Sequence, residues 1–250
     1  MQAQNLHALR REAAREALAT AMLLGLAAAL VVALDWMAHA FAVKALAVFA
    51  FSCLLLLWGL ASHMPHRRFG AGNRVTLLRL AMIALLAGGV GEAMDSPNPI
   101  AWAAVVLATI AALLDAVDGP LARSQGLTSE FGARFDMESD AFLIMVLSLL
   151  VWHFGKAGAW VLLAGLARYL FVAAAWAWPW LSEPLPHSMR RKTICVVQIT
   201  CLIVCLGPII SRPWSQAIAG ASLGLLLISF AIDVLWLAQR RHLSLSPKGD

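Results

Sequence analysis

Residues 104–152 read AVVLATIAALL, then DAVDGPLARSQGLTSEFGARFDMESD from Asp115 to Asp140, and finally AFLIMVLSLLVW. Two long apolar runs therefore enclose a polar stretch that contains four aspartates. A helix that crosses a bilayer needs about 20 mostly apolar residues, and carboxylates at membrane depth are costly unless a site requires them. We interpret this region as two spanning helices that carry a functional site where they meet.

The spacing of the polar and small residues fits two helical faces that point toward each other. Residues three and four apart share one face of a helix, and the first group follows that pattern: Asp115, Asp118, Gly119 and Ala122. The second group recurs every four residues: Gly132, Asp136 and Asp140. The intervening SQGLTSE is polar and contains Gly126, which predicts a turn between antiparallel helices. Solvated loop charges would explain residues 123–130, but not aspartates that adjoin long apolar runs.

The convergence of four carboxylates predicts a particular chemistry. In a low dielectric they cannot all stay ionised together without cations. Ligands that are all oxygen favour hard cations such as Mg²⁺, Mn²⁺ or Ca²⁺. The small side chains of Gly119, Ala122 and Gly132 leave room for a bulky ligand, such as a nucleotide, to approach the backbone. The segment therefore predicts a site for metal and phosphate.

The whole chain has the composition of a polytopic α-helical membrane protein. Of its 250 residues 61% are hydrophobic and 13% are charged, and the mean hydropathy is +0.78, far from an average soluble domain. Several apolar stretches are long enough to span a bilayer: Ala17–Leu34, Ala42–Ala61, Val75–Gly91, Ile100–Leu121, Ala133–Trp152, Ala157–Leu181, Thr193–Ile210 and Trp214–Gln239. We expect about eight spans. Residues 1–18 predict a basic amphipathic helix on the membrane surface.

Basic residues are divided unequally between the two sides that eight spans define. One side contains both termini, the turn between the aspartates and most of the cations: Arg10, Arg11, Arg15, Arg67, Arg68, Arg74, Arg123, Arg134, Arg190, Arg191, Lys192, Arg240, Arg241 and Lys248. The other side holds Lys44, Lys156 and Arg212. By the positive-inside rule, both termini and the aspartate site face the cytoplasm. The compact chain points to a bacterial inner membrane. Its net charge of +5 suits an anionic lipid surface, and its dispersed cations argue against nucleic-acid binding.

The aspartate segment resembles the signature of a known family. The pattern D-x2-D-G-x2-A-R-x8-G-x3-D-x3-D is similar to that of the CDP-alcohol phosphatidyltransferases at all eight fixed positions: Asp115, Asp118, Gly119, Ala122, Arg123, Gly132, Asp136 and Asp140. GNRVTLLRL resembles the N-x2-T-x2-R that opens the first core helix in many members: Asn73, Thr76 and Arg79. MRRKTICVVQI is similar to a K-T-x4-Q element of phosphatidylglycerophosphate-synthase-like members: Lys192, Thr193 and Gln198.

The resemblance implies an all-α membrane fold with a six-helix catalytic unit. That unit would cover residues 73–241. Residues 1–72 would form an N-terminal addition, made of the amphipathic segment and two further transmembrane helices, and residues 242–250 a cytoplasmic tail. Family members tend to be homodimers, a state that the residues themselves neither support nor deny.

The resemblance also implies an enzyme of phospholipid biosynthesis. It would transfer a phosphatidyl group from CDP-diacylglycerol, or the equivalent group from a related CDP-alcohol, to an acceptor alcohol and release CMP. Family members use two divalent cations, Mg²⁺ or Mn²⁺, and four residues match the ligand positions: Asp115, Asp118, Asp136 and Asp140. Asp140 also matches the general base. The residues expected to border the nucleotide are Thr76, Gly119, Ala122, Arg123 and Gly132.

These motifs leave the acceptor open. Arg168 lies within an apolar span, and we expect it to form an anion pocket with Arg134, Arg190 and Arg191, which would favour glycerol 3-phosphate. Ordinary positive-inside charge explains Arg190 and Arg191 equally well, so serine, inositol, choline or another amino-alcohol stays possible, as does a CDP-amino-alcohol donor. A divalent-cation transporter would also contain intramembrane carboxylates. It gives no reason for the small residues and the arginine at fixed offsets.

Overall fold

The computed structural model describes residues 2–63, 68–92, 97–183, 185, 186 and 188–245. Within these ranges the chain is all helical, as its composition predicts. The α-helices are α1 (Gln2–Ala33), α2 (His39–Gly59), α3 (Ala71–Gly88), α4 (Pro97–Ser124), α5 (Glu130–His153), α6 (Leu162–Ala177), α7 (Met189–Leu206) and α8 (Arg212–Leu245). Short 3-10 turns occupy Leu60–His63, Ala159–Val161 and Pro179–Ser182.

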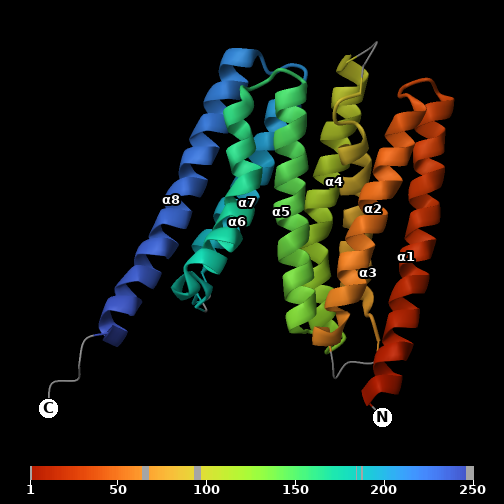
Figure 1. Cartoon of the computed structure of the whole chain (residues 1–250). Helices are drawn as coiled ribbons and strands as arrows, with labels where there is room; N and C mark the ends of the chain where they lie inside the picture. The colour runs from red at the N-terminus through yellow and green to blue at the C-terminus, as the bar shows by residue number, and fades with distance from the viewer. Residues whose placement is uncertain (1, 64–67, 93–96, 184, 187, 246–250) are drawn as a thin grey trace, which may run out of the picture.

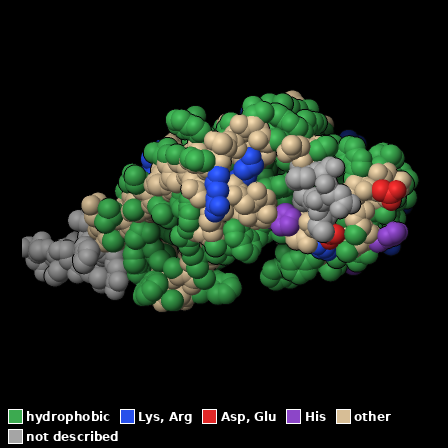
Figure 2. Space-filling model, turned by 90° about the horizontal axis from the view of Figure 1, so that it is seen from above, with side chains coloured by type: hydrophobic (Ala, Val, Ile, Leu, Met, Phe, Trp, Pro, Cys, Tyr) green, Lys and Arg blue, Asp and Glu red, His purple; other side chains and the backbone are tan. Residues whose placement is uncertain are grey.

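The helices run up and down beside one another, so that α1 begins and α8 ends at the same end of the bundle (Figure 1). We call this the basic end, because it carries most of the described cations: Arg10, Arg11, Arg15, Arg68, Arg74, Arg123, Arg134, Arg190, Arg191, Lys192 and Arg240. The predicted contributions of positions 67, 241 and 248 lie outside the described side chains. Figure 2 views the opposite end, where few Lys and Arg side chains are visible. The predicted division of charge is thus present in the fold.

Among the described helices, six are long and apolar enough to cross a membrane: Leu6–Ala33, His39–Gly59, Ala71–Gly88, Asn98–Ser124, Ala159–Ala177 and Arg212–Arg240. The other two, α5 and α7, carry clustered charges in their halves nearest the basic end. Those charges are the acidic residues of the aspartate segment and Arg190, Arg191 and Lys192. The chain is a polytopic membrane protein, and many large apolar side chains on its outer surface are exposed, among them Leu23, Leu54 and Trp58.

The first helix differs from the expectation of a separate surface helix at residues 1–18. Residues 2–33 form one continuous helix of 32 residues, about 48 Å long at 1.5 Å per residue. The hydrocarbon core of a bilayer is only about 30 Å thick, so the first turns of α1 extend beyond it. Leu9 and Ala13 are fully buried against the neighbouring helices. This packing fixes the basic segment in line with the span.

The helix α3 lies at the centre of the bundle and positions the site. It packs against α1, α2, α4 and α5, and polar side chains on it are buried together with the apolar ones. One apolar core joins α3 to α4–α8, with Ile83, Leu143 and Leu202 among its members. A second core joins α3 to α1 and α2 through Phe49 and Leu77. The two apolar cores on either side of α3 therefore fix the side chains that α3 directs toward α4 and α5.

Candidate active site

The turn between α4 and α5 has the form that the sequence predicts. The helix α4 ends at Ser124, and Gly126 adopts a positive φ of +63° that L side chains rarely take. The helix α5 begins after Ser129, whose hydroxyl accepts a 3.0 Å hydrogen bond from the backbone N–H of Gly132, as an N-cap residue does. Both helices pack against α3, so the acidic face of each helix lies next to α3.

Three of the four aspartates form a compact group. One carboxylate oxygen each of Asp115, Asp118 and Asp136 lies within 4.8 Å of the others. The first two side chains come from α4 and the third from α5. Asp118 is the most deeply buried, and Thr76 on α3 donates a 3.1 Å hydrogen bond to its Oδ2. The predicted convergence of four carboxylates is thus confirmed for three of them.

A fully buried arginine lies among these carboxylates. Arg79 on α3 has no exposed side-chain surface. Its Nη1 lies 2.8 Å from Asp115 Oδ1, 3.0 Å from Asp118 Oδ2 and 2.8 Å from Asp136 Oδ1. Its Nη2 donates a 2.6 Å hydrogen bond to Asp140 Oδ1, and its Nε donates to the carbonyl of Ala111. Arg79 thus contacts all four aspartates, the compact group through Nη1 and Asp140 through Nη2.

Arg79 does not satisfy the site by itself. A terminal guanidinium nitrogen has two N–H groups, and Nη1 faces three carboxylate oxygens. Asp115 Oδ1 is close enough for an ion pair, but it is buried and receives no aligned hydrogen bond in the described structure. Four ionised carboxylates and one guanidinium would carry a formal charge of −3, which is unfavourable in a buried site. A donor set of oxygens with excess negative charge fits hard divalent cations.

A cavity of about 170 Å³ adjoins the aspartates. Its lining includes Asp118 and Asp136 together with all five residues that the sequence assigns to the nucleotide: Thr76, Gly119, Ala122, Arg123 and Gly132. The structure adds residues that the sequence did not single out for this role: Phe69, Gly70, Gly72, Asn73, Leu127, Thr128, Ser129 and Ala133. The cavity therefore lies among the start of α3, the end of α4 and the start of α5.

One of these added residues, Gly72, allows α3 to approach α4 closely. A Cβ at position 72 would lie 2.8 Å from the backbone oxygen of Asp118 and 3.0 Å from the Cβ of Ala122. Real Cβ atoms essentially never come so near to a backbone oxygen. Gly72 therefore sets the separation of the helix that carries Arg79 from the helix that carries Asp115 and Asp118. In the sequence, Gly72 is visible only as a small residue before Asn73. Nothing there indicates which helix it contacts.

The four arginines expected in one acceptor pocket lie in three different surroundings. Arg168 forms an ion pair with Glu138 on α5, with a 3.1 Å hydrogen bond from Nε. Arg190 donates a 2.5 Å hydrogen bond to Asp233 on α8, and Arg191 lies 3.4 Å from the same carboxylate oxygen. Arg134 is exposed on α5. The carboxylates that pair with these arginines were not anticipated, because sequence spacing gives no distance between helices.

The fold and the site together define a polytopic membrane protein with a buried acidic centre beside a polar cavity. The sequence model of the CDP-alcohol phosphatidyltransferases matches residues 69–235, about two-thirds of the chain. The chain belongs to the CDP-alcohol phosphatidyltransferase family, a family of transferases, as its motifs predicted.

It is similar to the CDP-diacylglycerol–glycerol-3-phosphate 3-phosphatidyltransferase of Bacillus subtilis (strain 168), with 33% identity over 109 residues. That match covers 40% of this chain and 56% of the relative, so the chain spans little more than half of the relative's length. No solved structure matches the chain significantly.

Proposed function

We propose that this protein transfers a phosphatidyl group from CDP-diacylglycerol to an alcohol and releases CMP. The observation that carries the proposal is the cluster of Asp115, Asp118 and Asp136, whose carboxylate oxygens lie within 4.8 Å of one another, next to a cavity partly lined by small residues. A diphosphate needs compensating positive charge, and a nucleotide needs space beside it. The carboxylates can bind the cations that compensate the diphosphate, and the cavity gives space for the nucleotide.

The carboxylates of Asp115, Asp118, Asp136 and Asp140 would hold two divalent cations, Mg²⁺ or Mn²⁺, which neutralise the diphosphate and stabilise the departing CMP. The roles of the chain's own residues follow from their contacts. Thr76 fixes the rotamer of Asp118, and Arg79 orients the carboxylates of α4 against those of α5. Arg123, in the cavity lining, offsets phosphate charge. Gly119 and Gly132 add no side chain to the cavity wall at their positions.

Asp140 is the proposed base for the acceptor. Its Oδ1 is held by Arg79, and its Oδ2 lies 3.8 Å from the thiol of Cys195 on α7. In the transfer, the acceptor oxygen forms a bond to the phosphorus that carries the diacylglycerol, and the phosphorus–oxygen bond to CMP breaks. The acceptor's proton passes to the carboxylate of Asp140. A fixed carboxylate within reach of the hydroxyl is the usual requirement for such a step.

We propose glycerol 3-phosphate as the acceptor. Two observations support it: the name of the Bacillus subtilis relative and the arginines at positions 168, 190 and 191. Because Glu138 and Asp233 already pair with these arginines, an acceptor phosphate would have to displace a carboxylate from at least one of them. Serine, inositol, choline and other amino-alcohols are the alternatives, since none of them needs an anion pocket for a phosphate of its own.

We further propose that residues 73–241 form the catalytic unit, that residues 1–72 are an addition to it, and that both termini face the cytoplasm of a bacterial inner membrane. The support for this orientation is the concentration of arginines at the basic end. The aspartate cavity is bordered by the start of α3 and the α4–α5 turn, both at that end. Soluble substrates would then enter from the cytoplasm.

The test of this proposal is an acceptor screen with the purified full-length protein. The protein in lipid nanodiscs is mixed with CDP-diacylglycerol, Mg²⁺ and one acceptor at a time, and CMP and the lipid product are measured. We expect release of CMP that depends on glycerol 3-phosphate. Release with serine, inositol or choline alone would replace the acceptor but keep the reaction. No release with any acceptor, together with divalent-cation flux in proteoliposomes, would favour the transporter instead.

A further inference from the structure

The N-terminal helix α1 reaches a part of the cavity wall, the segment 69–73 that leads into α3. Phe69, Gly70, Gly72 and Asn73 all line the cavity. Gly70 precedes α3 with a φ of +84° and, as a glycine, has no side chain of its own to cap the helix. Within the segment, Asn73 donates a 2.6 Å hydrogen bond to the carbonyl of Phe69, and further contacts come from outside α3.

Glu12 on α1 makes two of those contacts. Its Oε2 accepts a 3.2 Å hydrogen bond from the backbone N–H of Phe69, and its Oε1 accepts a 3.3 Å bond from Nη2 of Arg74. Glu16, one turn later, approaches the same nitrogen of Arg74 at 2.9 Å. One carboxylate of the added helix thus holds the segment at its first residue and just past its last.

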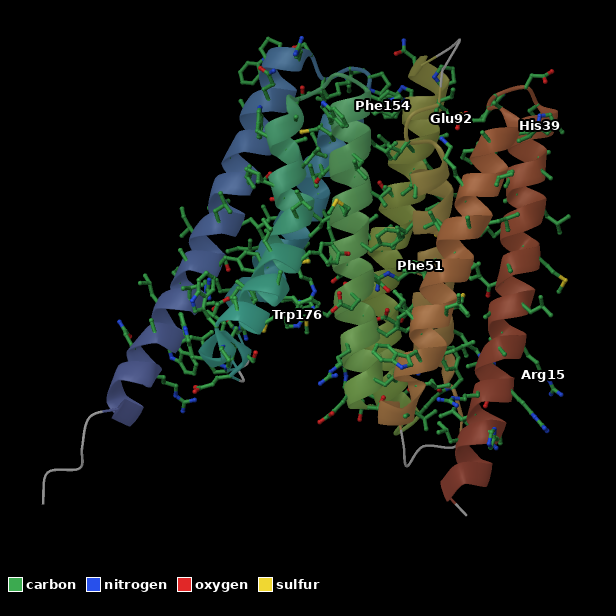
Figure 3. All side chains as sticks on the ribbon, viewed as in Figure 1. Arg15, His39, Phe51, Glu92, Phe154 and Trp176 are labelled. Carbon is green, nitrogen blue, oxygen red and sulfur yellow. The ribbon has the colours of Figure 1, made fainter. Side chains whose placement is uncertain are left out.

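The packing beneath these polar contacts keeps α1 in place. Leu9 and Ala13 flank Glu12 on the helix and are fully buried, in the same apolar cluster as Leu60 and Phe69. Arg15 is exposed and projects from α1 at the basic end, whereas His39, Glu92 and Phe154 lie at the other end (Figure 3). The face of α1 that carries Glu12 is therefore the one that meets the core.

The other side of the segment rests on the aspartate helices. Gln125, after the end of α4, accepts a 2.8 Å hydrogen bond from the N–H of Ala71. The ring of Phe69 lies 6.5 Å from that of Phe131 on α5. A Cβ at position 70 would come 2.9 Å from Leu127. The segment is thus held between α1 on one side and the α4–α5 turn on the other.

We infer that Glu12 is a positioning residue for the nucleotide half of the donor, because it fixes the segment 69–73 against the cavity. This inference rests on the proposed function of that cavity. It assigns a role to the added helix α1 beyond membrane anchoring. The ion pairs with Arg74 are partly exposed, and exposed pairs contribute little. The hydrogen bond to the N–H of Phe69 is the contact that matters.

The experiment compares Glu12→Ala with Glu12→Gln, which keeps an oxygen acceptor, and with Glu16→Ala, which removes a carboxylate that contacts Arg74 but not the N–H of Phe69. Each full-length protein is studied in nanodiscs with Mg²⁺. Hydrogen exchange of the peptide that contains residues 69–73 reports on the segment, CMP titration reports on the cavity, and thermal unfolding reports on the fold. Together these readouts separate positioning from a general loss of stability.

We expect Glu12→Ala to accelerate exchange in the segment and to raise the Kd of CMP about tenfold, with an unchanged Tm. Glu12→Gln and Glu16→Ala should stay within about twofold of wild type, since a lost acceptor to a backbone N–H matters more than an exposed pair. Unchanged exchange in Glu12→Ala would overturn the inference. Faster exchange with unchanged CMP affinity would overturn the link to the donor while leaving the proposed function intact. A wild-type protein that binds no CMP would overturn both.

Discussion

Arg79 donates a 3.0 Å hydrogen bond from Nη1 to Oδ2 of Asp118, although the two residues are 39 positions apart and both are buried. This bond joins the central helix α3 to the first helix of the aspartate segment. Because the same nitrogen lies 2.8 Å from Asp136 on α5, Arg79 connects both acidic faces. The position of the carboxylates therefore depends on a residue outside the eight-position signature.

Replacing Arg79 by Met should destabilise the protein by roughly 3–5 kcal/mol, because it leaves buried carboxylates without their cation. Thermal unfolding in nanodiscs measures this loss. A divalent cation would supply the missing charge, so Mg²⁺ should raise the Tm of Arg79→Met more than that of wild type. If the variant unfolds at the wild-type temperature with and without Mg²⁺, Arg79 is not what balances the aspartates.

Adding one methyl group at Gly72 should separate α3 from α4. The new Cβ would lie 2.8 Å from the backbone oxygen of Asp118, and overpacking of this kind costs about 1–3 kcal/mol. We expect Gly72→Ala to lose both stability and CMP release. Gly224→Ala is the matched control, since nothing lies within 4 Å of a Cβ at that helical position. Equal behaviour of the two variants would show that the close approach is unimportant.

Replacing Arg168 by Gln should raise the KM for glycerol 3-phosphate about tenfold or more and leave the KM for CDP-diacylglycerol unchanged. A charge-assisted hydrogen bond to a phosphate contributes roughly 1.5–3 kcal/mol, and the donor is expected at the aspartate cavity. Steady-state kinetics with each substrate varied in turn measures both constants.

The pair of Arg168 with Glu138 supplies the control for that experiment. If Arg168 serves only to hold α6 against α5, Glu138→Gln and Arg168→Gln should lower the Tm alike and affect both substrates together. If it binds the acceptor, Glu138→Gln frees the guanidinium and should not raise the acceptor KM. A stable Arg168→Gln enzyme with unchanged acceptor kinetics would favour an acceptor without a phosphate.

Reporter fusions at Met1 and Asp250 should both be cytoplasmic, because α1 begins and α8 ends at the basic end. A fusion inserted at residues 95–96, just before α4, should report the opposite side. Termini on different sides of the membrane would mean an odd number of spans. Since α1 and α2 pack tightly on α3, such a result would also contradict the described arrangement of those two helices.

The aspartate site was largely predictable from the sequence, for a physical reason. Helical periodicity fixes which side chains share a face, and the turn chemistry of Gly126 and Ser129 fixes where the two helices reverse. These features predict that the carboxylates of the two joined helices converge, and in the structure α3 packs against both helices. The same reasoning pointed to Gly119, Ala122 and Gly132 beside the aspartates, while the family resemblance added Thr76 and Arg123; all five line one cavity, although what they bind stays a prediction.

Contacts between helices that are distant in the chain were not predictable in this way. Arg79 was recognised only as part of a motif, and its place among the aspartates arises from the packing of α3 between α4 and α5. Glu138 and Asp233 were missed as partners of Arg168 and Arg190 for the same reason. The continuation of α1 through its basic segment depends on the burial of Leu9 and Ala13, which a charge pattern does not reveal.

The central claim is that the carboxylates of α4 and α5 bind the metal on which the transfer depends. The most direct test measures CMP release by Asp118→Asn as a function of Mg²⁺ concentration. The matched control is Asp35→Asn, which makes the same change of charge on the α1–α2 connection at the opposite end. We predict that wild type and Asp35→Asn release CMP only with Mg²⁺, and that Asp118→Asn stays folded but is inactive at saturating Mg²⁺. Near wild-type turnover by Asp118→Asn, or release of CMP by wild type after complete removal of divalent cations, would contradict the account.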